Sequence, residues 1–237
     1  NKLKAENVSF EEIELKDLLY EDVYKLVSEA LSAGQENISF LSDIIYTKTK
    51  GNAFYVWQFL KSIYDEKFMR FDFDLQQWQW NADLILQMNV SGNVVELMTS
   101  FVQKLPEETL GLLKIASSLG NRFDKQSLSV IKQVNEKKIE SLLNLSLTEG
   151  LIISSGTEYK FSHDRIQQAI YSLIPEDEKT SLHLLNGQRL TSHFNQIDLE
   201  NKIFDLVNQW NLGAEKITDK KEKTYLANLN LMAGHKA

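Results

Sequence analysis

The chain has 237 residues, no cysteine, two prolines and a formal net charge of −7. The lack of cysteine excludes a disulfide framework, a zinc ribbon and a thiolate nucleophile, and the acidic balance argues against a surface for nucleic acid or anionic membrane. No apolar run approaches the ~20 residues that cross a bilayer, and Asn1 does not open a signal peptide. We therefore expect a cytoplasmic chain, excised from a longer protein.

Helical periodicity dominates the first part of the chain. Apolar side chains recur every three or four positions over 23–31, 41–48 and 53–64, which predicts three amphipathic helices. Asn52 directly precedes the third of these helices and is placed as its N-cap. Residues 10–15 alternate instead between apolar and polar, which predicts a short strand.

A two-residue period over 68–80 predicts a β-hairpin with aromatic side chains gathered on one face. The side chains of that face are Met69, Phe71, Phe73, Trp78 and Trp80. They either cover a helical core or form a platform on which a ligand stacks, and we favour the first interpretation. Another helix is predicted over 93–105, before Pro106.

The middle of the chain predicts a winged helix-turn-helix over 106–161. The first of its three helices is expected over about 107–119. The second is a short helix that begins after an N-cap at Asp124, and the third spans about 136–149 after an N-cap at Asn135. Two short strands, 151–153 and 158–161, follow and are joined through Ser155-Gly156-Thr157.

A winged helix can bind DNA, but the charge of this module argues against it. Residues 106–161 contain seven basic and seven acidic side chains, so the module is neutral. Its third helix offers only Lys137 and Lys138 to the phosphates that a recognition helix must neutralise. DNA binding is therefore the weakest functional alternative.

The last third of the chain, 162–237, is predicted to be helical. Apolar stripes and stop residues place helices over 166–173, 176–194 and 203–210, with a final helix capped by Thr218 or Asp219. Helices paired through short loops predict the start of a repeat array. Because no linker is rich in proline, glycine or serine, we expect one rigid, mainly α block.

The sequence contains no complete catalytic or metal-binding constellation. No Gly-Lys dipeptide occurs, so the chain lacks a Walker A phosphate loop, and neither HExxH nor GxSxG is present. The four histidines include no i, i+4 pair suited to a metal, and we interpret His183 and His193 as solvated or capping side chains. We predict no catalytic residue, no metal ligand and no tightly bound cofactor.

One local feature could bind a ligand. Ser162-His163-Asp164 stands where the second predicted strand ends and a helix begins. Ser162 is a good N-cap, the first backbone N–H groups of a helix can bind an anion, and His163 could donate a hydrogen bond to a phosphate. Alternatively, Ser162 and Asp164 simply cap the helix while His163 fills a gap. From the residues alone this structural alternative is the stronger.

Four segments resemble one family. They are Lys48-Thr49-Lys50-Gly51-Asn52-Ala53-Phe54-Tyr55, which is similar to a KT-x-GNPFF pattern, Trp78-Gln79-Trp80, the run from Phe161 to Tyr171 and the run from Leu226 to Ala237. The family is the ATPase module of bacterial hybrid proteins that join a serine/threonine kinase-like domain to a sensor histidine kinase. That module is grouped with the signal-transduction ATPases with numerous domains.

The resemblance implies a division of the chain. Residues 1–16 would end a P-loop core, 17–105 would form a helical lid with its hairpin, 106–161 the winged helix, and 162–237 the start of a helical repeat region. The partners implied are a P-loop ATPase core in cis and the kinase domains of the same polypeptide, with self-association as a further option. No nucleic acid and no membrane partner is expected.

The resemblance also implies a nucleotide site. In that superfamily the lid contacts the adenine side of the nucleotide, and a winged-helix histidine touches the β-phosphate of ADP. Gly51 and Asn52 match the first contact, although Ala53 replaces the usual proline, and His163 and Asp164 match the second, with Ser162 replacing methionine. The chain would then be the regulatory, non-catalytic part of a signalling ATPase whose parent protein uses ATP, ADP and magnesium. The alternative is a protein-interaction scaffold with no nucleotide role.

Overall fold

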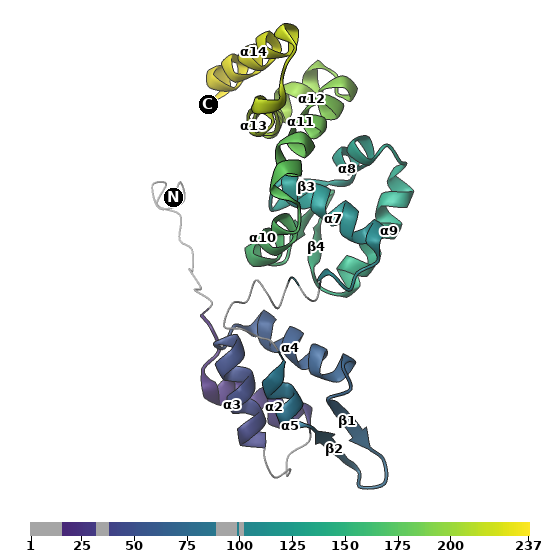
Figure 1. The fold of residues 1–237 in the computed structure, drawn as a ribbon, viewed down its shortest axis with the longest axis vertical. Helices are drawn as coiled ribbons and strands as arrows, with labels where there is room; N and C mark the ends of the chain where they lie inside the picture. The colour runs from purple at the N-terminus through teal and green to yellow at the C-terminus, as the bar shows by residue number, and fades with distance from the viewer. Residues whose placement is uncertain (1–15, 32–37, 89–98, 100–101) are drawn as a thin grey trace. The chain divides into compact units, whose positions relative to one another are not determined.

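We describe the fold from a computed structural model of the chain, which Figure 1 shows as a ribbon. The structure describes residues 16–31, 38–88, 99 and 102–237. The chain divides into two compact units, Asn1–Val94 and Val95–Ala237, rather than the single block expected, and each unit is described by itself. The predicted strand over 10–15 and most of the predicted helix over 93–105 lie outside the described residues.

The first unit is built mainly from helices. These are α2 (Tyr20–Ala30), α3 (Ile38–Thr49), α4 (Ala53–Asp65) and α5 (Ala82–Gln87). Most side chains of the predicted stripes face inward, although Trp57 and Tyr64 of α4 are 64% and 48% exposed. The fully buried side chains of these helices form the core: Val23, Val27, Leu41, Ile45, Val56, Phe59 and Ile63. The three helices predicted before residue 65 are therefore confirmed, whereas the six-residue helix α5 was not predicted.

The predicted hairpin is present in the same unit. Its strands are β1 (Met69–Asp72) and β2 (Gln77–Trp80), which pair antiparallel. Phe71 lies opposite Trp78 with ring centroids 5.5 Å apart, and Tyr64 of α4 lies edge-on to Trp78 at 6.1 Å. Met69 is buried, but Phe73 lies beyond the strand and is 78% exposed, so its predicted place on the covered face is wrong. The rest of the aromatic face packs in part against α4, as the favoured interpretation expects.

The second unit begins with three helices and a three-stranded antiparallel sheet. The elements are α7 (Glu107–Leu119), β3 (Arg122–Asp124), α8 (Lys125–Lys132), α9 (Glu136–Thr148), β4 (Ile152–Ser155) and β5 (Glu158–Phe161). The strand order is β3-β5-β4. The three predicted helices and the two predicted strands β4 and β5 are therefore present in the predicted order, and β3 is an additional strand. Phe123 of β3 is buried and stacks on Tyr159 of β5 at 6.0 Å.

Helices fill the rest of the second unit. They are α10 (Asp164–Ser172), α11 (Glu176–His193), α12 (Gln196–Asn201), α13 (Ile203–Leu212) and α14 (Lys220–Lys236), with a 3₁₀ turn over Ala214–Lys216. α11 packs against α13, and α13 packs against α14, which agrees with the predicted pairing of successive helices. Gly213 permits the close approach of α11, because a Cβ there would lie 2.6 Å from the Cα atom of Leu184. Among the helices of the described residues, none combines the length and the apolar character needed to cross a bilayer.

Candidate functional site

The predicted Gly51-Asn52-Ala53 site forms the turn between α3 and α4. Gly51 has φ +79°, and its carbonyl accepts a hydrogen bond of 2.7 Å from the N–H of Leu18. A Cβ at this position would lie 2.0 Å from the carbonyl oxygen of Leu18. Two backbone segments therefore approach each other so closely that only glycine fits.

Asn52 has the capping role predicted for it. Its side-chain oxygen accepts a hydrogen bond from the N–H of Tyr55 at 3.3 Å, and its amide lies 3.4 Å from a carboxylate oxygen of Asp17. Ala53 is exposed and is the first residue of α4. Proline is favoured at a first helical position but is not required there, so alanine replaces it without losing the helix start.

Lys48, the first residue of the same motif, ties α3 to α5. Its ammonium group donates hydrogen bonds to the carbonyls of Leu86 and Met88, at 3.2 and 2.9 Å, where α5 ends. A cation at a helix C-terminus satisfies carbonyls that have no partner within the helix. Burial lowers the pKa of Lys48. The motif in the first unit is thus explained by local structure.

In the second unit, β5 meets α10 at Ser162-His163-Asp164. The N-cap of α10 is His163, whose Nδ1 accepts a hydrogen bond from the N–H of Arg165 at 3.1 Å. The prediction that Ser162 caps this helix is wrong. The end of β5 lies beside the start of β4, and the Ser162 hydroxyl donates to the carbonyl of Gly150 at 2.6 Å instead.

The cap fixes how the imidazole can act. Because Nδ1 of His163 accepts a hydrogen bond, the proton of the neutral ring is on Nε2. The ring is half-buried at the corner. The carboxylate of Asp164 accepts a hydrogen bond of 2.7 Å from the amide of Asn121, which lies 43 residues earlier in the chain. The sequence analysis missed Asn121, because no local pattern links it to this corner.

The five predicted site residues fall into two groups. Gly51, Asn52 and Ala53 belong to the first unit, and His163 and Asp164 belong to the second. The structure therefore gives two separate local geometries, one in each unit.

His183 is buried, so the interpretation of this residue as solvated or capping is wrong. Its side chain is 2% exposed and lies between the Tyr171 hydroxyl and the Gln209 amide, at 2.8 Å from each. Burial lowers the pKa of His183, and the charge of Lys179 lowers it further, whereas the hydrogen bond with Gln209 opposes the shift. His193 is exposed at the last position of α11, as expected for a solvated side chain.

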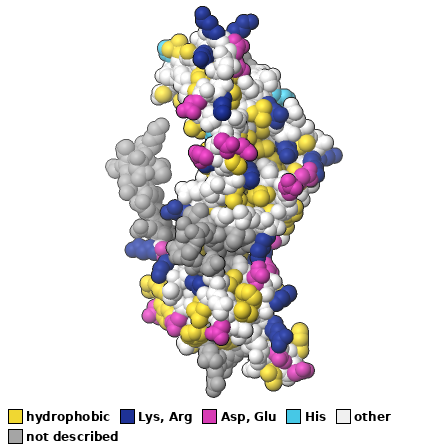
Figure 2. Space-filling model, in the orientation of Figure 1, with side chains coloured by type: hydrophobic (Ala, Val, Ile, Leu, Met, Phe, Trp, Pro, Cys, Tyr) yellow, Lys and Arg dark blue, Asp and Glu magenta, His cyan; other side chains and the backbone are white. Residues whose placement is uncertain are grey.

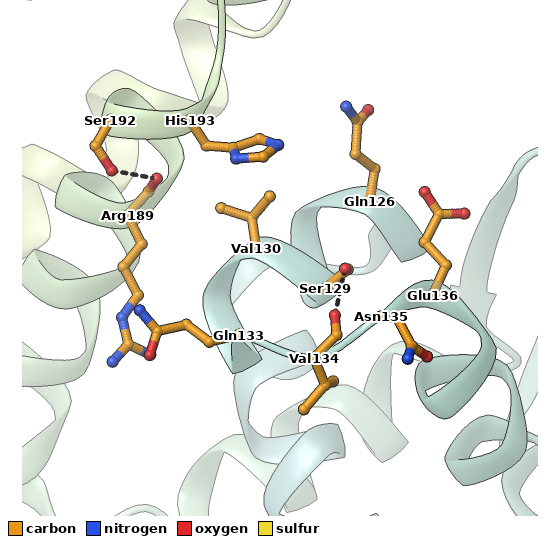
Figure 3. Close-up of a pocket in the computed structure, with 10 residues that line it drawn as sticks. All are labelled: Gln126, Ser129, Val130, Gln133, Val134, Asn135, Glu136, Arg189, Ser192 and His193. Carbon is orange, nitrogen blue, oxygen red and sulfur yellow. Dashed lines mark hydrogen bonds between the residues drawn. The ribbon is translucent and has the colours of Figure 1, made fainter.

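A cavity of about 490 Å³ opens elsewhere on the second unit (Figure 3). Its lining side chains come from α8, from the turn before α9 and from the last turns of α11, and they include Arg189 and Glu136. The guanidinium of Arg189 already donates to the carbonyl of Ile131, near the end of α8. The cavity is not suited to an anion, because its lining carries one charge of each sign and the guanidinium of Arg189 is already hydrogen-bonded. None of the predicted site residues lines this cavity.

Several charged side chains of the helix–sheet module form ion pairs. Lys125 contacts Glu140 at 2.6 Å and Glu136 at 3.3 Å, and Lys138 contacts Glu108 at 2.8 Å. Figure 2 shows basic and acidic side chains interspersed over the visible surface. Paired cations do not provide the unopposed basic surface that DNA requires. Within the residues that the structure describes, no three histidine or acidic side chains are grouped so that they could hold a metal ion.

Comparison with known proteins finds two histidine kinases that are similar to the chain. It is 29% identical to the hybrid signal transduction histidine kinase G of Dictyostelium discoideum, over 95% of this chain and 8% of that protein. It is 27% identical to the peroxide stress-activated histidine kinase mak3 of Schizosaccharomyces pombe, over 77% of this chain and 8% of that protein. No protein-family model matches the chain.

The chain thus resembles a small part of large signal-transduction kinases, since it spans about 8% of the length of each relative. Both relatives come from eukaryotes, so these comparisons do not support the resemblance to an ATPase module of bacterial proteins.

Proposed function

We propose that the chain is a regulatory, non-catalytic part of a multidomain signalling kinase in which the state of a bound nucleotide controls the output. The alignment with two histidine kinases supports the signalling context. The motifs around Gly51 and His163 support the nucleotide, because they resemble the ATPase module of hybrid kinases. In this proposal the P-loop core and the kinase domains are other parts of the same cytoplasmic polypeptide.

The observation that carries the proposal is the capping role of His163. A ring held by the N–H of Arg165 has a fixed orientation, and its Nε2–H is a donor for a phosphate oxygen. The start of α10 adds a favourable dipole for an anion. We assign the β-phosphate of ADP to His163 and Asp164, and the adenine side to Gly51, Asn52 and Ala53.

The proposed switch works by differential binding. ADP would stabilise a closed arrangement through the contact of His163 with the β-phosphate, and exchange for ATP would weaken that contact. A single contact of this kind biases a two-state equilibrium by about 1 to 3 kcal/mol. Hydrolysis would require a P-loop core with magnesium, because the chain has no Walker A motif.

Retention of ADP tests this proposal. A polypeptide that joins the chain to its P-loop core is passed through a desalting column, and the ADP that stays bound is quantified. We expect His163→Ala to retain at least about tenfold less ADP, the equivalent of ~1.4 kcal/mol. The matched control is Asn135→Ala, which removes another side-chain N-cap in the same unit, where Asn135 accepts from Lys138 N–H at 2.9 Å. Equal retention in both variants would refute the nucleotide role.

An interaction scaffold without nucleotide is the second candidate, and one observation favours it. Gly51 is required by the close approach of Leu18, and Lys48 is occupied by the end of α5, so neither residue needs a nucleotide to explain it. On this view His163→Ala leaves ADP retention unchanged. The same experiment therefore separates the two candidates.

A further inference from the structure

One face of α10 carries a row of polar side chains that begins at the His163 corner. His163, Gln167 and Tyr171 are four residues apart, so they follow one another along the helix. The amide of Gln167 donates to the carbonyl of Ser117 in α7 at 2.7 Å, and the Tyr171 hydroxyl lies 2.8 Å from Nε2 of His183. The 9 residues of α10 span about 13 Å along the helix axis.

The row ends in a buried polar network shared by α7, α11 and α13. Gln209 accepts from Asn186 at 3.2 Å and donates to the carbonyl of Ser118 at 2.8 Å, and Asn186 also donates to the Ser118 hydroxyl at 2.9 Å. His183, Asn186 and Gln209 are 2%, 0% and 1% exposed.

The directions of the hydrogen bonds in this network follow from its members. The side-chain oxygen of Gln209 can only accept, so Nδ1 of His183 carries the proton between them. Nε2 of the neutral ring is then an acceptor, and the Tyr171 hydroxyl donates to it. The direction of the hydrogen bond between Tyr171 and His183 is therefore set by the hydrogen bond between His183 and Gln209.

We propose that Tyr171, His183 and Gln209 couple the His163 corner to α11 and α13, so that a displacement of the start of α10 is transmitted to the paired helices. This deepens the proposed function, on which it rests for the source of the displacement. A buried polar group that loses its partner is destabilising, so the network resists gradual distortion and shifts as a unit. Tyr171, His183 and Gln209 are positioning residues in this scheme, since none of them would touch the nucleotide.

The imidazole of His183 is a direct probe of this coupling. Its two ring nitrogens can be observed by ¹⁵N NMR in the 237-residue chain without any nucleotide. We expect His163→Ala to shift both nitrogen signals of His183, because the loss of the cap loosens the start of α10. Asn135→Ala, which removes the cap of α9 outside the network, should leave them unchanged.

Two further variants keep the test decisive if His163→Ala unfolds the unit. Gln167→Met removes the hydrogen bond to Ser117 from the middle of the row while it keeps the cap, and it should also shift the His183 signals. Tyr171→Phe should abolish the response to His163→Ala, because it removes the hydroxyl that joins α10 to His183.

Unchanged His183 signals in folded His163→Ala and Gln167→Met, or equal shifts in Asn135→Ala, would overturn the coupling. Because this experiment contains no nucleotide, its failure leaves the ADP assignment open to its own test. Conversely, normal ADP retention in His163→Ala would refute the nucleotide role and leave the coupling intact.

Discussion

Nδ1 of His183 lies 2.8 Å from the side-chain oxygen of Gln209, in the interior between α11 and α13. The two residues are 26 positions apart in the chain, and both are almost fully buried. Burial of a polar group is costly unless the group is hydrogen-bonded, so this contact offsets the cost of burying both side chains between α11 and α13. Its loss should be measurable as a loss of stability.

Gln209→Ala should lower the free energy of unfolding of the second unit by about 2 to 4 kcal/mol. The substitution leaves Nδ1 of His183 and the carbonyl of Ser118 without the partner they have now, and unsatisfied buried groups are expensive. The matched control is Gln188→Ala, which removes a part-buried hydrogen bond to Glu222 and should lower the stability less, because water can replace the lost partner at this site. Urea unfolding of both variants gives the comparison, and similar losses would contradict the importance of the network.

The stability of the second unit should fall as the pH drops below about 6.5. Burial lowers the pKa of His183 in the folded chain, so the unfolded chain takes up the proton first. Since the unfolded state binds more protons in this range, the stability is fully present above the unfolded pKa and is lost as the pH falls toward the folded one.

The control for this pH dependence is His183→Asn, which cannot titrate. Urea unfolding between pH 7.5 and 5.5, about one unit either side of the unfolded pKa of histidine, should show a smaller slope in this variant than in the unsubstituted chain. Identical slopes would mean that His183 does not control the acid response.

Local signals explain what could be predicted from the sequence. Asn52, Asp124, Asn135 and Asp219 all cap helices as expected, because a cap needs only a side chain and an N–H two or three residues later. Helical stripes were equally predictable, since their period is a property of neighbouring residues. The coarse architecture of helices and small antiparallel sheets followed from these two signals.

Contacts between distant segments explain most of what could not be predicted. β3 has three residues and exists because it pairs with β5, more than 30 residues later. His183 looked like a surface residue, since its burial depends on Tyr171 and on Gln209 of α13. His163 rather than Ser162 caps α10, because the Ser162 hydroxyl is occupied by Gly150. The spacing of His163, Gln167 and Tyr171 was nevertheless a visible signal for one polar row on α10.

Gly51→Ala should destabilise the first unit by about 2 to 5 kcal/mol. An alanine there is strained by the positive φ of +79°, and its Cβ would overlap the carbonyl oxygen of Leu18 at 2.0 Å. Gly150→Ala is the control, because Gly150 has φ +70° but open space around it, so only the backbone strain of about 1 to 2 kcal/mol applies. Hydrogen exchange measured by mass spectrometry reports each unit separately. Equal effects would show that Leu18 moves away without cost.

Lys202→Met should destabilise the second unit at neutral pH. The ammonium group donates to the carboxylate of Asp124 at 2.6 Å and to the Ser127 hydroxyl at 3.0 Å, and both members of the ion pair are partly buried. Burial alone would raise the pKa of Asp124, but the hydrogen bonds from Lys202 and Ser127 outweigh it and lower the pKa. A hydrogen bond to a charged group contributes about 1.5 to 3 kcal/mol, and methionine keeps most of the packing volume of lysine.

The pH dependence distinguishes this ion pair from simple packing. Because the folded pKa of Asp124 is depressed, the stability that it contributes is present above its unfolded value of 3.8 and is lost as the pH falls through the folded pKa. The difference between Lys202→Met and the unsubstituted chain should therefore shrink in acid. Lys138→Met, which removes an exposed pair with Glu108, should change the stability much less than Lys202→Met does at neutral pH. A Lys202→Met difference that persists unchanged in acid would mean that its packing on the Phe194 ring, at 4.9 Å, outweighs the charge.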